Sequence, residues 1–202
     1  MEKKSNEFFK FGAKMLIIDF SVAPAIFDKA IKEGDFSENR NIHWHLGWGE
    51  YLPDTKFPII FNQSDSDGKK IRDVIPMRFS PWIFLISDKF KSVLEENAIT
   101  GWKSYPAKVY DKKGNPILGY SGFSITGRGG EMEGASSPEW KEICRSGQRL
   151  KYNSNQWDGS DIFRIDPAFL AVSNKFRDVL IKNKITGVKC YPLSEDGVDI
   201  LG

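Results

Sequence analysis

The chain has 202 residues, enough for one domain or two small ones with a sizeable buried core. Its 29 Lys and Arg nearly balance its 27 Asp and Glu, which argues against a nucleic-acid-binding or membrane-surface protein. Because Cys144 and Cys190 are the only cysteines and the apolar runs are too short to span a membrane, we expect a cytoplasmic protein with reduced thiols.

The N-terminal part of the chain, 1–76, predicts alternating strands and helices. A strand is expected over 14–20, a helix over 23–33 and a second strand over 57–61. The polar stretch NQSDSDGKK at 62–70 predicts a turn. The repeated sequence pattern described next does not occur in this part of the chain.

Residues 77–106 and 163–192 share one sequence pattern. At a constant offset of 86 they are identical at 14 of 30 positions, where ordinary composition gives about two by chance. The matched pairs are Arg78/Arg164, Pro81/Pro167, Ser87/Ser173, Lys89/Lys175, Phe90/Phe176, Val93/Val179, Leu94/Leu180, Asn97/Asn183, Ile99/Ile185, Thr100/Thr186, Gly101/Gly187, Lys103/Lys189, Tyr105/Tyr191 and Pro106/Pro192. We therefore predict two related strand–helix–strand units.

Each unit carries the signals that begin and end one helix. Ser87 and Ser173 are placed as N-caps, and the Phe, Val and Leu that follow fall at i, i+3 and i+4 on one apolar face. Asn97 and Asn183 are expected to end the helices in the left-handed conformation. Because packing accounts for nearly every shared residue, we interpret the repeat as scaffold rather than as an active site.

The chain between the units predicts a β-hairpin and then a long loop. KVYDKKGNPILGY at 108–120 reads as a hairpin that turns at 113–116, and SGFSITG at 121–127 extends or follows it. Gly, Ser and charged residues dominate 127–148, which predicts a long functional loop. The expected fold is thus a single α+β domain over 1–202.

Several short motifs resemble chemical sites without completing one. His43 and His45 lie two apart but have no third ligand at zinc-like spacing, so we expect no metal. The stretch GRGGEMEG fits no phosphate-binding pattern, and DSDG at 65–68 lacks the glutamate of a calcium loop. No cofactor is expected.

The segment WDGSD at 157–161 places two carboxylates three residues apart beside an indole. Acid–base catalysis, contact with a protein partner and an ordinary turn are all compatible with this spacing. Arginine and aromatic residues dominate interface energies, so the candidate partner-binding residues are Arg128, Trp140, Trp157, Asp158 and Asp161. The alternative is that Trp157 and Asp161 only fix the entrance to the second unit.

The order GWKSYPAKVYDKKGNPILGYSGFSITGRGG, then WDGSDIF, then VSNKFRDVLIKNKITGV resembles a bacterial family of immunity proteins from polymorphic toxin systems, the group first described from myxobacterial proteins of unknown function. The resemblance covers roughly residues 75–193. It implies a cytoplasmic, non-enzymatic protein that neutralises a cognate toxin. Inhibitors of basic nuclease toxins are often acidic, so the near-neutral charge does not indicate which toxin is bound.

Two other functions stay open from the sequence. One is a small enzyme or ligand-binding protein that uses the 127–161 region with Arg128, Asp158 and Asp161. The other is an adaptor module that has no toxin partner. The oligomeric state and the role of the 1–76 part are not determined by the sequence.

Overall fold

A computed structural model describes residues 8–13, 19–25, 45–53, 55–64, 68–77, 80–132, 152, 154–166 and 169–193. Its strands are β1 (Phe8–Ala13), β2 (Val22–Pro24), β3 (Ile59–Gln63), β4 (Val74–Met77), β5 (Ser80–Ser87), β6 (Trp102–Tyr105), β7 (Ala107–Tyr110), β8 (Pro116–Ile117), β9 (Tyr120–Ile125), β10 (Gly127–Glu131), β11 (Ile162–Asp166), β12 (Phe169–Ser173) and β13 (Val188–Pro192). Its helices include α3 (Asp88–Glu96), α5 (Asn174–Lys182) and the short 3₁₀ helix η1 (Ser154–Gln156), and residues 45–48 are helical as well.

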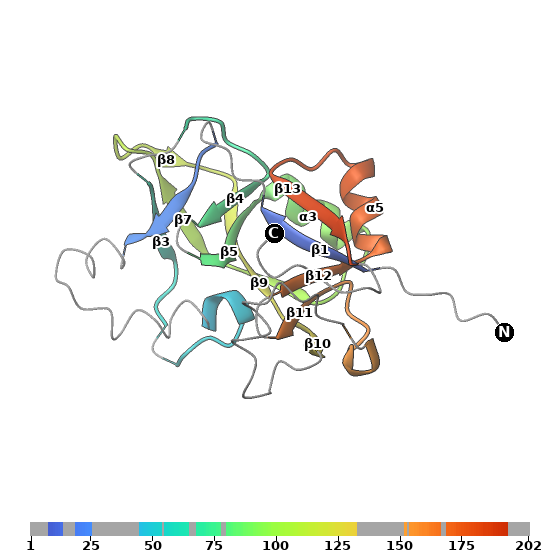
Figure 1. The fold of residues 1–202 in the computed structure, drawn as a ribbon. Coiled ribbons are helices and arrows are strands. Elements are labelled where there is room, and N and C mark those ends of the chain that lie inside the picture. Colours follow the sequence, from blue (N-terminus) through green and yellow to red (C-terminus); the bar gives the residue numbers. More distant parts are fainter. Residues whose placement is uncertain are drawn as a thin grey trace, which may run out of the picture.

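The described residues form a mixed, sheet-rich fold with few helices, compatible with the α+β class (Figure 1). One sheet has five strands in the order β10-β11-β12-β1-β13, and the other has eight in the order β6-β9-β5-β4-β2-β3-β7-β8. Neighbouring strands are antiparallel except at the pairs β10/β11, β2/β4 and β3/β7, which are parallel.

We call β4-β5-α3-β6 the first segment and β11-β12-α5-β13 the second segment. In the first segment β9 lies between β5 and β6, and in the second β1 lies between β12 and β13. Phe123 of β9 pairs with Phe84 and Ser104, while Phe11 of β1 pairs with Cys190. In each segment, therefore, two of its own strands are separated by a strand that comes from elsewhere in the chain.

The two helices begin as the sequence predicts. The hydroxyls of Ser87 and Ser173 accept hydrogen bonds from the amides of Phe90 and Phe176, at 3.1 and 3.2 Å. This N-capping satisfies amide groups that have no partner within the first turn. Both N-cap predictions are confirmed.

The helix ends differ from the prediction. Asn97 and Asn183 have φ of −98° and −90°, and the left-handed residues are Ala98 and Lys184, one position later. Each Asn side chain instead donates its Nδ2 to the carbonyl oxygen of the residue four before it, at 2.8 and 2.9 Å. The asparagines are therefore used for a side-chain hydrogen bond, while the next residue makes the turn.

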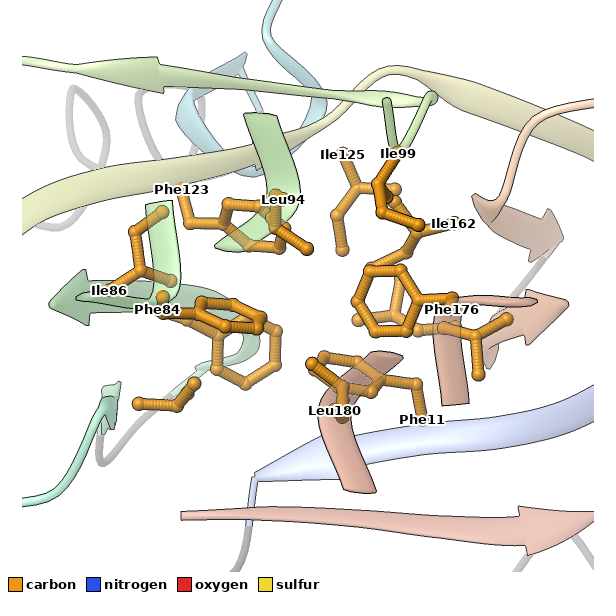
Figure 2. Packing of buried hydrophobic residues seen from close by; sticks show 14 of the residues in the cluster. Phe11, Phe84, Ile86, Leu94, Ile99, Phe123, Ile125, Ile162, Phe176 and Leu180 are labelled. Carbon is orange, nitrogen blue, oxygen red and sulfur yellow. The ribbon is translucent and has the colours of Figure 1, made fainter. Parts of the chain in front are cut away.

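A shared apolar core joins the two sheets and both helices (Figure 2). The rings of Phe90 on α3 and Phe176 on α5 meet edge to face with centroids 6.4 Å apart. Phe11 of β1 contacts both Phe176 and Phe84, at 5.6 and 5.9 Å between centroids. Since each segment contributes to one core, neither can bury its apolar face without the other.

The N-terminal predictions need correction. Ala23 and Pro24 lie in β2 rather than in a helix, Ala25 after them is helical, and residues 26–33 of the predicted helix lie outside the described residues. Most of the strand predicted over 14–20 also lies outside them, whereas β1 ends at Ala13. The strand predicted at 57–61 is present as β3, shifted two residues toward the C-terminus.

The region between the segments also differs in part. The hairpin is confirmed as β7 and β8, with its turn at 111–115. Residues 127–131 form β10 rather than the start of a loop, and 133–148 lies outside the described residues. A Cβ on Gly129 would collide with the ring of Phe163, so this glycine serves close packing within the sheet.

Candidate functional site

Four of the five predicted partner-binding residues lie in the described chain, around β10 and the start of β11. Arg128 is on β10, and the other three precede β11. The fifth, Trp140, lies outside the described residues. Their contacts show which side chains remain available to a partner.

Asp161 is the most buried of the four, at 8% exposure. One carboxylate oxygen accepts from the hydroxyl of Ser173 at 2.9 Å, and the other accepts from the amide and hydroxyl of Thr100 at 3.1 and 3.3 Å. The ammonium of Lys175 lies 3.0 Å from the same second oxygen. We call Asp161, Ser173, Thr100 and Lys175 the Asp161 cluster, which joins the second segment to the turn after α3.

Asp73 has the same kinds of partners as Asp161, but its serine and lysine come from the first segment and its threonine from the second. Its carboxylate accepts from the Ser87 hydroxyl at 3.0 Å and from the amide and hydroxyl of Thr186, both at 2.8 Å. The ammonium of Lys89 lies 3.7 Å away. We call Asp73, Ser87, Thr186 and Lys89 the Asp73 cluster, which joins the first segment to the turn after α5.

Sequence reasoning missed Asp73 because the two aspartates do not align at the repeat offset. The separation in sequence is 12 from Asp161 to Ser173 but 14 from Asp73 to Ser87. The irregular pairing of β4 with β5, which shifts register between Pro76 and Met77, accommodates the longer connection. An alignment that allows a gap of two positions in this hairpin brings the pair into correspondence.

Burial and hydrogen bonding act in opposite directions on Asp73. Burial alone would raise the pKa of its carboxyl, but hydrogen bonds from Thr186 and Ser87, together with nearby Lys89, hold the pKa below its ordinary value. The carboxylate therefore stays charged while it holds the two segments together.

Trp157 and Asp158 are also used within the fold. The indole of Trp157 donates to the carbonyl of Ser160 at 2.9 Å and packs on the ring of Phe8, with centroids 5.0 Å apart. The carboxylate of Asp158 accepts from the amides of Arg128 and Ser160, at 2.8 and 2.9 Å. These contacts match the alternative in which the WDGSD stretch fixes the entrance to the second segment.

Arg128 keeps a partly exposed side chain and pairs with a residue far away in sequence. Its guanidinium lies 2.8 Å from the carboxylate of Glu50, with 34% of the arginine side chain exposed. In the parallel ladder of β10 and β11, Arg128 is the partner of Arg164, whose guanidinium stacks 3.7 Å from the ring centroid of Trp48. Two neighbouring arginines thus attach the 48–50 stretch to the sheet, a non-local contact that no local motif could reveal.

Two tyrosines near these groups have raised pKa values. Burial, with the charges of Asp73 and Asp88, raises the pKa of Tyr120 to about 12, and its hydroxyl donates to the carbonyl of Arg72 at 2.8 Å. Burial and the charge of Asp158 raise the pKa of Tyr152 to about 12. Both phenols keep their protons at neutral pH even more firmly than an ordinary tyrosine, so neither can accept a proton there as a general base.

The described ranges contain neither a metal-ligand group nor a helix that could span a membrane. Within them, no three His, Cys, Asp or Glu side chains are grouped as metal ligands; of the predicted histidine pair, His43 lies outside these ranges. No helix within them has the length and apolar character that a membrane crossing requires.

The chain matches no protein-family model, and no curated protein is significantly similar to it.

Proposed function

We propose that the first and second segments are two related units arranged about a pseudo-twofold axis, each completed by a strand from outside it. The strand order supports this: β6-β9-β5-β4-β2 and β13-β1-β12-β11-β10 correspond position by position. At the repeat offset of 86, the pairing of Ser104 with Phe123 corresponds to that of Cys190 with Phe11. In this proposal β1 serves in the second unit as β9 serves in the first.

We propose further that the protein is a non-enzymatic immunity protein that binds and neutralises a cognate toxin in the cytoplasm. The observation that carries this proposal is the structural use of Asp158 and Asp161, the two carboxylates that the enzyme alternative needs. Both accept hydrogen bonds from backbone amides, and Asp161 is also buried beside Lys175. A stoichiometric inhibitor needs no free acid–base pair, only a rigid surface of the right shape.

The two linked units support the same proposal through their rigidity. Preformed interfaces lose less conformational entropy on binding than mobile ones, and this favours tight inhibition. The Asp73 and Asp161 clusters fix both helices relative to both sheets before any partner arrives. Among the described candidate residues, Asp158 is exposed and Arg128 is partly exposed; we choose Arg128 as the contact to test because the Asp158 carboxylate is already bonded to two backbone amides.

A co-expression assay tests the proposed function. The toxin domain encoded by the adjoining gene is induced in bacteria with or without the full chain, and growth is followed. Growth rescue by the wild-type chain is the expected result, and undiminished toxicity at equal expression would contradict the proposal.

Two variants separate interface from scaffold in the same assay. Trp157→Ala should lower the melting temperature, because the indole packs on Phe8 and Phe163. Arg128→Ala should lower the melting temperature less than Trp157→Ala, since the exposed ion pair with Glu50 contributes little to stability and the other loss is of two hydrogen bonds from Nη1 to the carbonyls of Ile125 and Gly127. Loss of protection in Arg128→Ala at unchanged melting temperature would place Arg128 in the interface.

A further inference from the structure

Strands β3, β7 and β8 have no counterpart in the five-stranded sheet. They extend the eight-stranded sheet beyond β2, at the opposite end of the molecule from α5 (Figure 1). If the ten corresponding strands form the duplicated scaffold, this extension is the part of the sheets that the duplication does not explain. Its outer face is therefore a candidate for a role of its own.

The two faces of the extension differ sharply. Phe61 and Val109 point inward and are 0% and 2% exposed, in the core shared with β2 and β4. Ile60 and Lys108 are paired neighbours on the opposite, outer face. Continuing the register of β7 with β8 by one residue places Leu118 beside Lys108. One row across the three strands thus consists of Ile60, Lys108 and Leu118.

This outer row leaves large apolar side chains in water. Ile60 is 45% exposed and Leu118 is 82% exposed. The next row on the same face holds polar Asn62, half-buried Tyr110 and exposed Pro116. A single exposed leucine is ordinary in a folded protein, but several exposed apolar side chains grouped on one sheet face, here on either side of Lys108, mark an interaction surface.

The surface is held rigidly. In the turn between β7 and β8, the carboxylate of Asp111 accepts from the amides of Lys113 and Asn115, each at 2.8 Å, and from the Asn115 side chain at 2.9 Å. The amide of Lys112 donates to the side chain of Gln63 at 3.2 Å, which ties the turn to β3. Little ordering is left to occur when a partner binds.

Among the described residues around the apolar row, lysines outnumber carboxylates, although the carboxylate of Asp88 lies near Gly119 at the end of the row. Lys108 lies within it, and Lys112 and Lys113 follow in the adjoining turn, all three exposed. The one carboxylate of this turn, Asp111, is directed to turn amides rather than outward. A partner complementary to this face carries acidic side chains around an apolar centre.

We propose that the outer face of β3, β7 and β8 is the docking surface for an acidic protein partner. This inference rests on the proposed function, and it assigns a toxin contact separate from Arg128, on a different sheet, with Ile60 and Leu118 as its apolar side chains on either side of Lys108. The lysines supply attraction and orientation, while the apolar row supplies the desolvated centre that dominates affinity.

Titration calorimetry with the toxin domain encoded by the adjoining gene tests the surface. Leu118→Asp and Lys108→Glu are compared with matched changes at the other end of the molecule, Ile181→Asp and Lys182→Glu on α5. Ile181 is 62% exposed, so it matches Leu118 in chemistry and accessibility. Melting temperatures of all four variants are measured first, and the Lys108 variant provides a second test if Leu118→Asp proves unstable.

The expected result is an affinity loss of about tenfold or more in each extension variant and of about twofold or less in each α5 variant. The affinity of the wild-type chain should also fall as salt is raised. If the wild-type chain binds and both extension variants bind with the same affinity as the wild type, the docking surface is overturned while the proposed function stands. Equal losses in all four variants would also overturn it, and no binding by the wild-type chain would contradict the proposed function itself.

Discussion

Asp73 and Asp161 bind the two segments together reciprocally: each accepts a hydrogen bond from a serine of its own segment and from a threonine of the other. Asp73 takes Ser87 and Thr186, and Asp161 takes Ser173 and Thr100. The serines are the N-caps of α3 and α5, so each carboxylate also fixes the start of a helix. The relative position of the two helices therefore depends on both aspartates.

Replacing either aspartate by asparagine should destabilise the protein. Asp161→Asn loses a buried charge-assisted acceptor, which should cost about 1.5–3 kcal/mol of unfolding free energy, and Asp73→Asn loses a partly exposed one that solvent screens, so its cost should be smaller. Urea titration followed by circular dichroism measures the change. Asp178→Asn is the control, because that carboxylate is 68% exposed and should contribute almost nothing. Equal stability of all three variants would show that the clusters do not hold the segments together.

The Asp73 cluster should also make the free energy of unfolding depend on pH in the acidic range. The pKa of Asp73 lies below its ordinary value in the folded protein, so its contribution is fully present above the pKa of an unfolded aspartate. That contribution is lost as pH falls through the lower, folded pKa. Urea titrations of wild type and Asp73→Asn from neutral pH into acid should show a stability difference that is constant near neutrality and shrinks in acid. A difference that grows in acid would contradict the assigned direction.

The turns after the helices should tolerate only glycine. Gly101 and Gly187 have φ of +88° and +85°, and a Cβ on either would collide with a backbone carbonyl, that of Ile162 or Val74. Alanine at either position should cost well above the roughly 1–2 kcal/mol of a left-handed alanine. Gly114 is the matched control, since its φ is +81° and its surroundings are open. Thermal unfolding of the three alanine variants checks this, and similar losses at all three positions would argue against the close approach of the segments.

The fold is predictable from the sequence where local signals decide it. Ser87 and Ser173 are recognisable as N-caps because capping depends on the few residues that follow. The insertion of β1 between β12 and β13 is not predictable, because strand pairing between Phe11 and Cys190 depends on contacts far apart in the chain. The strand β10 has the composition of a loop because its glycines serve close packing in the sheet.

The candidate site is predictable in position but not in role. The 157–161 stretch does lie beside β10, yet Asp161 is used to join the segments rather than to face solvent. Its carboxylate is buried by Thr100 and Lys175, one contributed by the other segment, and no spacing within 157–161 carries that information. Asp73 is hard to find because it lies two positions farther from Ser87 than Asp161 lies from Ser173, so the two aspartates do not align at the repeat offset.

Cys190 should react slowly in the folded protein. Burial, only partly offset by nearby Arg177, raises the pKa of its thiol to about 11, so roughly one thiol in a thousand is ionised at pH 8. In a Cys144→Ser background, labelling by a thiol-specific disulfide reagent should be much slower before than after unfolding in urea. Fast labelling of the folded chain would show that the β13 side chain is not packed against the core.

Complex formation with the toxin domain encoded by the adjoining gene tests the central claim most directly. The full chain and an inactive variant of that domain are mixed at micromolar concentration without added metal or cofactor, and size-exclusion chromatography with light scattering measures the mass of each peak. A stoichiometric inhibitor should yield one peak with the mass of a one-to-one complex. Separate elution of the two proteins at their individual masses would contradict the account.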